Sequence, residues 1–224
     1  MEQQLKREGN SKLSHDKMSY DAKQYGPDVT FDEPAFIHPS VQIYGKVSVG
    51  RDASIWPNTV MRAENYEIVI GEMTNIQDFV MVHVGDGTGT YVGANCSITH
   101  NVTLHGCRVG DNCLVGINAT LMDNSEIGDN CIVGAGAVLT AGTRIPDNSI
   151  VVGAPAKAIK TRNNYVANKW NAWMYQINAQ AYCEGNHRRW DGADFVREAK
   201  DKMKELMTEF DALKKSGAPI AREE

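Results

Sequence analysis

The fold is decided by residues 109–133, which read VGDNCLVGINATLMDNSEIGDNCIV. An aliphatic residue stands at every sixth position, and a small residue follows four positions later. A period of six fits neither an α-helix, which repeats about every 3.6 residues, nor a meander of hairpins. It is typical of a β-solenoid, in which short strands and tight turns stack so that one aliphatic side chain per unit fills the interior.

The same period extends in both directions and covers roughly residues 35–156. Its further aliphatic positions are Ile37, Ile43, Val49, Ile55, Met61, Ile70, Ile76, Val82, Val92, Ile98, Leu104, Leu139, Ile145 and Val151. Three residues are inserted near Glu67 and four near Thr88, and one is missing before Val109. This pattern resembles the hexapeptide-repeat family, which implies a mainly β fold, a left-handed parallel β-helix with three hexapeptides per coil. We therefore expect about six coils and, because the family usually forms trimers, a homotrimer.

The composition excludes several classes of partner. The chain has 224 residues and a formal net charge of −5, so its electrostatics favour neither nucleic acid nor an anionic membrane. No apolar run approaches the roughly 20 residues of a transmembrane helix, and the first residues lack the apolar core of a signal peptide. Five cysteines are an odd number, which argues against a disulfide framework and favours a reducing, cytoplasmic compartment. Cys96, Cys113 and Cys131 each follow an aliphatic position by four, so we interpret them as core residues.

The chain divides into a polar N-terminal arm, residues 1–27, a repeat domain, residues 28–160, and a C-terminal helical region, residues 161–224. In the last region the apolar spacing changes from six to three and four, as in amphipathic helices. Two such runs are separated near Gly185 and residues 190–192. Their apolar positions are Val166, Trp170, Trp173, Ile177 and Ala181, then Phe195, Ala199, Met203, Leu206, Phe210 and Leu213. We interpret both as helices that pack on the solenoid or on a neighbouring chain.

Three of the six histidines lie close together in the repeat register. His83 and His105 each follow an aliphatic position by one and are one coil apart, so they should stack about 4.8 Å apart. Arg62 belongs to the same column, whereas Asp78 and His100 form a second column on the preceding edge of the triangle. In a trimer, His100 of one chain can meet His83 and His105 of the next. Three imidazoles with an open fourth position are the ligands of a catalytic zinc-type site.

The segments around these residues are distinctive. They are residues 74–78 (TNIQD), His83, residues 100–107 (HNVTLHGC) and residues 153–157 (GAPAK). Together they resemble the gamma-class carbonic anhydrases. The resemblance implies that His83 and His105 of one chain and His100 of the adjacent chain bind Zn²⁺, with Fe²⁺ or Co²⁺ as other metals for the site. It also implies a lyase that hydrates carbon dioxide reversibly to bicarbonate by a metal-bound hydroxide at trimer interfaces.

The resemblance suggests roles for further residues. Gln77 would hold the metal-bound water or the substrate by hydrogen bonding. Arg62 and Asp78 would form an ion pair between chains that shapes the pocket, although such a pair can equally be purely structural. Asn178 and Tyr182 begin and end the segment NAQAY, which resembles part of the family's C-terminal helix. They either line the pocket or serve only to pack the helix.

Two features depart from the family's pattern. The family usually has Arg-Gly-Asp where this chain has Arg62, Ala63 and Glu64, so the carboxylate is kept but moved by about one methylene. The conformational freedom of glycine is lost at the middle position. The loop at residues 84–90 is short, and Asp86 is its only acid. We therefore expect proton transfer to be slow, or to use Glu64 or buffer.

Other functions remain open on the same fold. Thioester hydrolysis would use the same attacking hydroxide and is favoured by a pocket widened near Glu64. An acyltransferase would use one histidine without a metal. The three convergent histidines argue against this function. A non-catalytic assembly subunit would bind metal without turnover and would use the helix at residues 195–213 as its docking surface.

Overall fold

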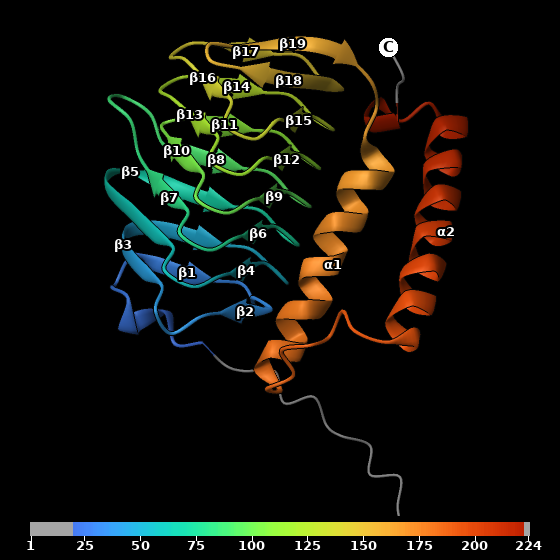
Figure 1. The fold of residues 1–224 in the computed structure, drawn as a ribbon. Coiled ribbons are helices and arrows are strands. Elements are labelled where there is room, and N and C mark those ends of the chain that lie inside the picture. Colours follow the sequence, from blue (N-terminus) through green and yellow to red (C-terminus); the bar gives the residue numbers. More distant parts are fainter. Residues whose placement is uncertain (1–19, 222–224) are drawn as a thin grey trace, which may run out of the picture.

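The computed structural model describes residues 20–221, which form a β-solenoid with two helices along one side (Figure 1). Short strands stack in parallel on three faces, and the inner strands of each face pair with strands of the coils before and after them. The predicted left-handed parallel β-helix followed by C-terminal helices is confirmed. The aliphatic period sets this architecture because one residue of each unit points inward on every face.

Face 2 is the most regular of the three faces. Its parallel strands are β2 (Phe36–Ile37), β4 (Ser54–Ile55), β6 (Asn75–Ile76), β9 (Ser97–Ile98), β12 (Leu114–Val115), β15 (Ile132–Val133) and β18 (Ser149–Gly153). These strands mark about seven turns, the last of them incomplete, where the sequence predicts about six. The first repeat unit, at Ile37, and the last, at Val151, both lie on face 2, so the repeat runs slightly past six coils and this face shows one strand more. On face 1, β1 (Val29–Phe31) also pairs with β3 (Gln42–Val49).

Faces 1 and 3 share β3 and β5 (Val60–Ile70), two long strands that continue without a break from face 3 into face 1. Face 1 also holds β1, β8 (Thr90–Val92), β11 (Arg108–Val109), β14 (Glu126–Ile127) and β17 (Arg144–Ile145). Face 3 also holds β7 (Met81–His83), β10 (Thr103–His105), β13 (Thr120–Leu121) and β16 (Val138–Leu139).

Both sequence insertions lie at this corner between faces 3 and 1. The pairing of β3 with β5 skips residues 64–66, so the three inserted residues bulge outward. Gly45 makes room for the bulge, since its φ is +80° and a Cβ there would lie 1.9 Å from the Ala63 carbonyl oxygen. The second insertion forms the loop of residues 84–89 between β7 and β8.

The two ends of the solenoid are covered by different means. At the N-terminal end, η1 (Ala22–Gln24) lies beside Tyr20 and Tyr25, whose rings pack against the core. At the C-terminal end, β19 (Ala156–Thr161) turns back and pairs antiparallel with β18. The last part of the predicted N-terminal arm therefore packs on the solenoid, and residues 1–19 lie outside the described residues. The predicted domain boundaries stay a prediction.

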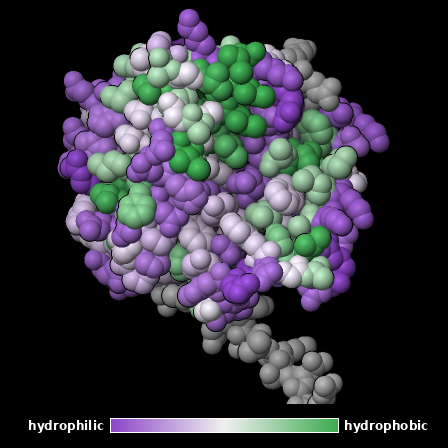
Figure 2. Space-filling model, viewed as in Figure 1, coloured by the Kyte–Doolittle hydropathy of each residue, from purple (hydrophilic) through white to green (hydrophobic). Residues whose placement is uncertain are grey.

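Both predicted helices are present. α1 (Tyr165–Cys183) lies along face 2 against β2, β4, β6 and β9, and α2 (Ala193–Ser216) packs on the outer side of α1 (Figure 1). η2 (Pro219–Ala221) then returns to the solenoid, where the Ile220 carbonyl accepts hydrogen bonds from Asn130 and Asn163. Figure 2 shows apolar side chains gathered over β15, β18 and β19, where Val152 and Ile159 are exposed. None of the helices within residues 20–221 has the length and apolar character needed to span a membrane.

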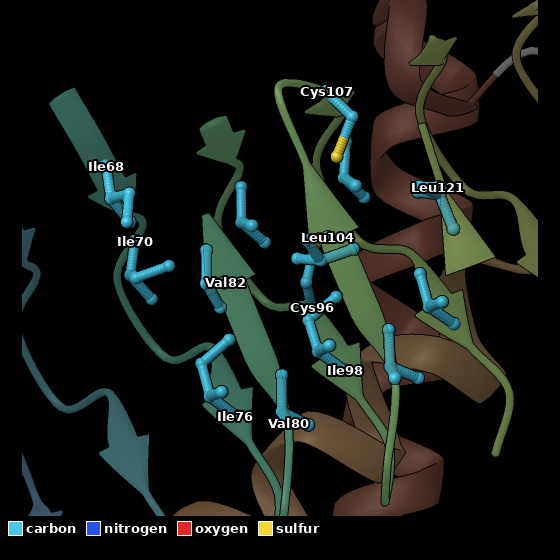
Figure 3. Close-up of a cluster of buried hydrophobic side chains, with 14 of the residues drawn as sticks. Ile68, Ile70, Ile76, Val80, Val82, Cys96, Ile98, Leu104, Cys107 and Leu121 are labelled. Carbon is cyan, nitrogen blue, oxygen red and sulfur yellow. The ribbon is translucent and has the colours of Figure 1, made fainter. Parts of the chain in front are cut away.

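The interior of the solenoid is a continuous stack of aliphatic side chains. Figure 3 shows Ile76, Val82, Ile98 and Leu104 on successive strands of faces 2 and 3, and all four are fully buried. Burying a side chain of this size contributes about 1.5–3 kcal/mol, so this stack is the main source of stability. The cysteines predicted to be core residues are fully buried as well: Cys96, Cys113 and Cys131.

Candidate metal centre

His83 and His105 stack on adjacent coils, as the repeat register predicts. They end β7 and β10 and are register partners, and Arg62 of β5 pairs with His83 on the other side. The His83 Nδ1 lies 3.1 Å from the His105 Nε2, and the ring centroids are 5.1 Å apart. The inward-facing Val82 and Leu104 fix this register, because a slip of one residue would turn both side chains to the outside.

His100 lies at a different corner of the same chain. It follows β9 on face 2, and its Nδ1 lies 3.0 Å from Oδ2 of Asp78, so the predicted Asp78–His100 column is present. Its side chain is 43% exposed and therefore available to a neighbour. Within residues 20–221, no three His, Cys, Asp or Glu side chains of one chain gather in a way that could hold a metal ion. A site with three imidazoles therefore requires His100 from a second chain.

Carboxylates contact the Nδ1 atoms of two of these imidazoles. Asp78 contacts His100, and Oδ1 of Asp123 lies 2.6 Å from the His105 Nδ1. An ionised carboxylate only accepts hydrogen bonds, so in the neutral form of either ring the proton lies on Nδ1 and Nε2 keeps its lone pair. Metal-binding histidines typically have such a partner on the non-ligating nitrogen. The donor set therefore fits a divalent metal of the zinc type, with Nε2 as the ligating atom of His100 and His105.

Glu64 connects Arg62 to the histidine pair. Its carboxylate forms an ion pair with Arg62, and its Oε2 lies 3.0 Å from the His83 Nε2. Slight burial acts to raise the pKa of Glu64, but hydrogen bonds from its own backbone N–H and from His83, with the charge of Arg62, lower that pKa below its ordinary value. Within one chain Arg62 thus pairs with Glu64, and Asp78 with His100. The predicted ion pair between Arg62 and Asp78 of neighbouring chains stays a prediction.

Gln77 lies on face 2, the face that α1 covers, and it is almost fully buried. Its Nε2 donates to Oδ1 of Asn75 at 2.8 Å, and Nδ2 of Asn75 donates to Oγ of Ser97 at 3.0 Å. The Ser97 hydroxyl in turn donates to Oδ1 of Asn171 on α1 at 2.7 Å. This chain of polar groups ties the helix to β6 and β9 and holds Gln77 next to the corner that carries His100.

Asn178 and Tyr182 are packed between α1 and the solenoid. Asn178 is buried, and the Tyr182 ring packs edge-on against Trp56 with centroids 4.9 Å apart. Tyr175 also packs against Trp56, at 5.6 Å. Burial, with a contribution from the charge of Asp78, raises the pKa of Tyr175 to about 12. A wall of aromatic rings therefore lies beside the corner with Asp78.

Two residues of this region are not predicted from the sequence, Asp123 and Tyr175. Asp123 stands two residues after Leu121, the same offset from an aliphatic position that Asp78 and His100 have. That shared offset is the signal by which it could have been found. Tyr175 shows only a helical spacing, which does not distinguish a residue near a site from one that packs a helix.

Four of the five cysteines are buried, and the fifth, Cys183, is partly exposed. All five are free thiols. Burial raises the pKa of the Cys107 thiol to about 12, although this residue directly follows the turn after His105. Burial and neighbouring thiols likewise raise the pKa of Cys113 well above its ordinary value. Protonated, inaccessible thiols are not nucleophiles at neutral pH.

Comparison with known proteins agrees with the hexapeptide-repeat fold. Residues 106–141 match the family described as bacterial transferase hexapeptide (six repeats). Gamma carbonic anhydrase 3, a mitochondrial protein of Arabidopsis thaliana, is 41% identical over 190 residues, which are 81% of this chain and 73% of that protein. The chain belongs to the gamma carbonic anhydrase family.

Other members of the gamma carbonic anhydrase family match over shorter stretches. Gamma carbonic anhydrase 1 of the same plant is 41% identical over 98 residues, so the match spans 41% of this chain and 36% of that relative. A crystal structure of a hexapeptide transferase family protein from Anaplasma phagocytophilum is also similar, with a TM-score of 0.65 and 31% identity. It covers 69% of this chain and 92% of that protein. Because both kinds of protein share the solenoid, the fold alone does not select the reaction.

Proposed function

We propose that this member of the gamma carbonic anhydrase family is a metal-dependent carbonic anhydrase, which hydrates carbon dioxide reversibly to bicarbonate at the interfaces of a homotrimer. The observation that carries the proposal is the stacked pair of His83 and His105, with Nε2 of His105 facing His83 and its Nδ1 held by Asp123. His100, with its Nδ1 held by Asp78, would supply the third imidazole from the neighbouring chain.

The three imidazoles would hold Zn²⁺, and the same nitrogen ligands also accept Fe²⁺ or Co²⁺, among which availability often decides. When bound, such a cation supplies Lewis acidity, which lowers the pKa of water toward neutrality. The chain itself contributes the orientation of the ligands, because Asp78 and Asp123 hold the rings of His100 and His105 with Nε2 free to ligate.

We assign binding of the substrate and the product to Gln77 and Arg62. Gln77 lies next to the corner with His100, and its amide is directed by the hydrogen bond to Asn75. We assign to this amide the orientation of water or carbon dioxide. The Arg62 side chain is 42% exposed beside His83, and its guanidinium suits a planar anion such as bicarbonate.

We assign the transfer of protons to Glu64. Its Oε2 lies 3.0 Å from the His83 Nε2, and half of its side chain is exposed to solvent. A carboxylate in this position can accept a proton at the site and release it directly to water or buffer. The loop of residues 84–89 is closed by a bridge between Gly85 and Thr88 and offers only Asp86 as a further acid.

Asn178 and Tyr182 form the proposed wall of the substrate pocket. Both lie on the covered side of α1, where Tyr182 and Tyr175 pack on Trp56. The phenol of Tyr175 is uncharged at neutral pH, and burial moves its pKa further away, to about 12. An uncharged aromatic wall suits a small apolar substrate such as carbon dioxide.

The corner that carries His100 has the exposed apolar side chains expected of an interface. Phe79, which follows Asp78, is 61% exposed, and Ile117 is 45% exposed. Ile117 lies one coil beyond His100, as the hydrogen bond from the Asn118 N–H to the His100 carbonyl shows. Large apolar groups exposed beside polar ligands are typical of surfaces that bury against a partner. This arrangement supports a homotrimer in which His100 reaches the next chain.

A metal-dependent thioesterase is the second candidate, and the altered turn at Glu64 favours it. Residues 64–66 bulge out of β5 at the mouth of the site, where the family usually has Arg-Gly-Asp. A wider mouth admits an acyl thioester, whose carbonyl carbon activated water can also attack. An acyltransferase without metal, and a non-catalytic assembly subunit that docks through α2, are the further alternatives.

The proposal is tested by stopped-flow hydration of carbon dioxide. The protein is loaded with Zn²⁺, or with Fe²⁺ in the absence of oxygen, and compared with His105→Ala and His38→Ala. His38 bonds Ser40 on face 2 and serves as the matched control. We expect a metal-dependent rate that His105→Ala loses and His38→Ala keeps. Metal-dependent thioester hydrolysis without carbon dioxide hydration would select the second candidate, and bound metal with neither activity would indicate an assembly subunit.

A further inference from the structure

The contact between Asp123 and His105 determines which nitrogen of the His105 ring is available. Oδ1 of Asp123 lies 2.6 Å from Nδ1, and the two side chains are 30% and 32% exposed, so water screens this contact only in part. Because the carboxylate accepts, the proton of the neutral ring lies on Nδ1. The opposite nitrogen, Nε2, is the atom that faces His83.

Two glycines of the preceding coils make the space that the Asp123 carboxylate occupies. A Cβ at Gly85 would lie 2.1 Å from Oδ1 of Asp123, and a Cβ at Gly106 would lie 2.6 Å from the same atom. The backbone around Asp123 is fixed by the stack of coils, since its carbonyl accepts from the Gly142 N–H at 2.8 Å. Three successive turns of one corner thus combine to direct a single carboxylate at an imidazole.

The corner between faces 1 and 2 shows what an aspartate ordinarily does in this solenoid. Oδ1 of Asp129 accepts the backbone N–H of Asp111 at 2.7 Å, and Oδ1 of Asp147 accepts the N–H of Asp129 at 2.9 Å. A glycine again makes the room, because a Cβ at Gly110 would lie 2.5 Å from Oδ1 of Asp129. An aspartate carboxylate packed over a glycine therefore supports the backbone at this corner, whereas the carboxylate of Asp123, packed in the same way, contacts a ring nitrogen.

We infer that Asp123 is a positioning residue, whose carboxylate, seated over Gly85 and Gly106, holds the His105 ring in the tautomer and orientation that present Nε2 to the metal. This inference rests on the metal site proposed above. Partners of this kind fix the ring of a metal-binding histidine and raise its basicity, and their loss typically weakens metal binding about 10–100-fold.

The first test is the affinity of the full chain for Co²⁺, measured by competition with a chromophoric chelator. Asp123→Ala should bind Co²⁺ about 10–100-fold more weakly than the wild type. Asp123→Asn, which keeps an accepting Oδ1 without the charge, should lie between the two. Asp129 packs over Gly110 at the other corner as Asp123 packs over Gly85, so Asp129→Asn should bind Co²⁺ as the wild type does.

The second test needs no metal and separates positioning from a merely structural role. The ¹⁵N shifts of the His105 ring report which nitrogen carries the proton in the metal-free protein. The wild type and Asp123→Asn should show the proton on Nδ1, and Asp123→Ala should move it toward Nε2. Unchanged shifts together with unchanged Co²⁺ affinity in Asp123→Ala would overturn the inference. A wild type that binds no Co²⁺ would instead overturn the proposed metal site and this inference with it.

A third variant displaces the carboxylate without removing it. Gly85→Ala places a methyl group where Oδ1 of Asp123 lies, and the backbone at Gly85 accepts alanine because its φ is not positive. It should weaken Co²⁺ binding as Asp123→Ala does. The double variant should be no weaker than Asp123→Ala alone, because both changes remove the same contact. Additive losses of Co²⁺ affinity would show that Gly85→Ala acts independently of Asp123. They would contradict the proposal that Gly85 makes room for the Asp123 carboxylate.

Discussion

The corner between faces 1 and 2 and the corner between faces 3 and 1 are built from the same repeat, yet their polar side chains behave differently. At the first corner, side chains form ladders that follow the coils. Their members are Asp111, Asp129 and Asp147, then Asn112, Asn130 and Asn148. At the second corner, the bulge at residues 64–66 and the loop at residues 84–89 interrupt the stack. There, Glu64, His83, His105 and Asp123 bond to one another instead.

The difference shows how a repeat protein makes a site. At the first corner, where the register is uninterrupted, the aspartates and asparagines of these ladders meet a backbone group or an identical side chain one coil away, and the hydrogen bonds support the fold. Where insertions break the register, unlike polar side chains face one another, and titratable groups gather at the surface. Mutations at the first corner are therefore expected to change the free energy of unfolding, and mutations at the second corner are expected to change the affinity for metal.

The largest expected effect tests whether the second corner is completed by another chain. His100→Ala and His105→Ala should each lower Co²⁺ affinity by more than about 100-fold, because removing a ligand costs more than removing its partner. When the two variants are unfolded, mixed in equal amounts and refolded together, about a quarter of the interfaces in a trimer should pair intact ligands. We expect that fraction of Co²⁺ sites to return. A mixture that recovers none would argue against a site shared between chains.

The next effect concerns the ladder at the first corner. Asn130→Ala should lower the free energy of unfolding by about 3 kcal/mol, since Asn130 is buried and three hydrogen bonds at roughly 1 kcal/mol each are lost. The measurement is urea denaturation, with Co²⁺ affinity as the second readout. A variant that loses Co²⁺ affinity but not stability would contradict the contrast between the two corners.

Glycine-to-alanine variants compare the two corners directly. Gly110→Ala should lower the free energy of unfolding by about 1–3 kcal/mol, because its Cβ would lie 2.8 Å from the Gly128 carbonyl carbon, a backbone atom that cannot move away alone. An aspartate Oδ1 is the nearest atom at both sites, but the nearest backbone atom at Gly85, the Gly106 Cα, lies farther away, at 3.0 Å from the Cβ position, so Gly85→Ala should cost less stability. Equal losses in urea denaturation would show that the two corners respond alike.

The smallest effect is a pH dependence of stability at the first corner. Burial, with the charges of Asp111 and Asp147, raises the pKa of Asp129 above its ordinary 3.8, although the Asp111 N–H acts to lower it. A carboxyl with a raised folded-state pKa contributes stability that is fully present below pH 3.8 and is lost as the pH rises through the folded-state pKa. Asp129→Asn keeps the acceptor without the charge. Its stability relative to wild type should therefore increase from about pH 3 to pH 7, measured by thermal unfolding; a constant difference would contradict the raised pKa.

Much of the fold and half of the site follow from the sequence. The stack of His83 on His105 is predictable because both follow a buried aliphatic residue, and the register of buried residues leaves no freedom. The pairing of Glu64 with His83 is not, because Glu64 lies in a bulge where the period is broken. Gln77 likewise has a predictable place on face 2, but its burial beside α1 depends on how the helix packs.

The sequence by itself therefore determined the solenoid, the columns of residues along it and the two helices. Each of these elements has a regular spacing of apolar residues, and only one arrangement of the element buries all of them. Only the tertiary structure decided which side chains meet across a corner, such as Asp123 with His105. Those contacts depend on rotamers, on glycine seats and on loops of irregular length. The repeat period determines only that the coils stack. It does not encode rotamers, the positions of these glycines or the lengths of irregular loops.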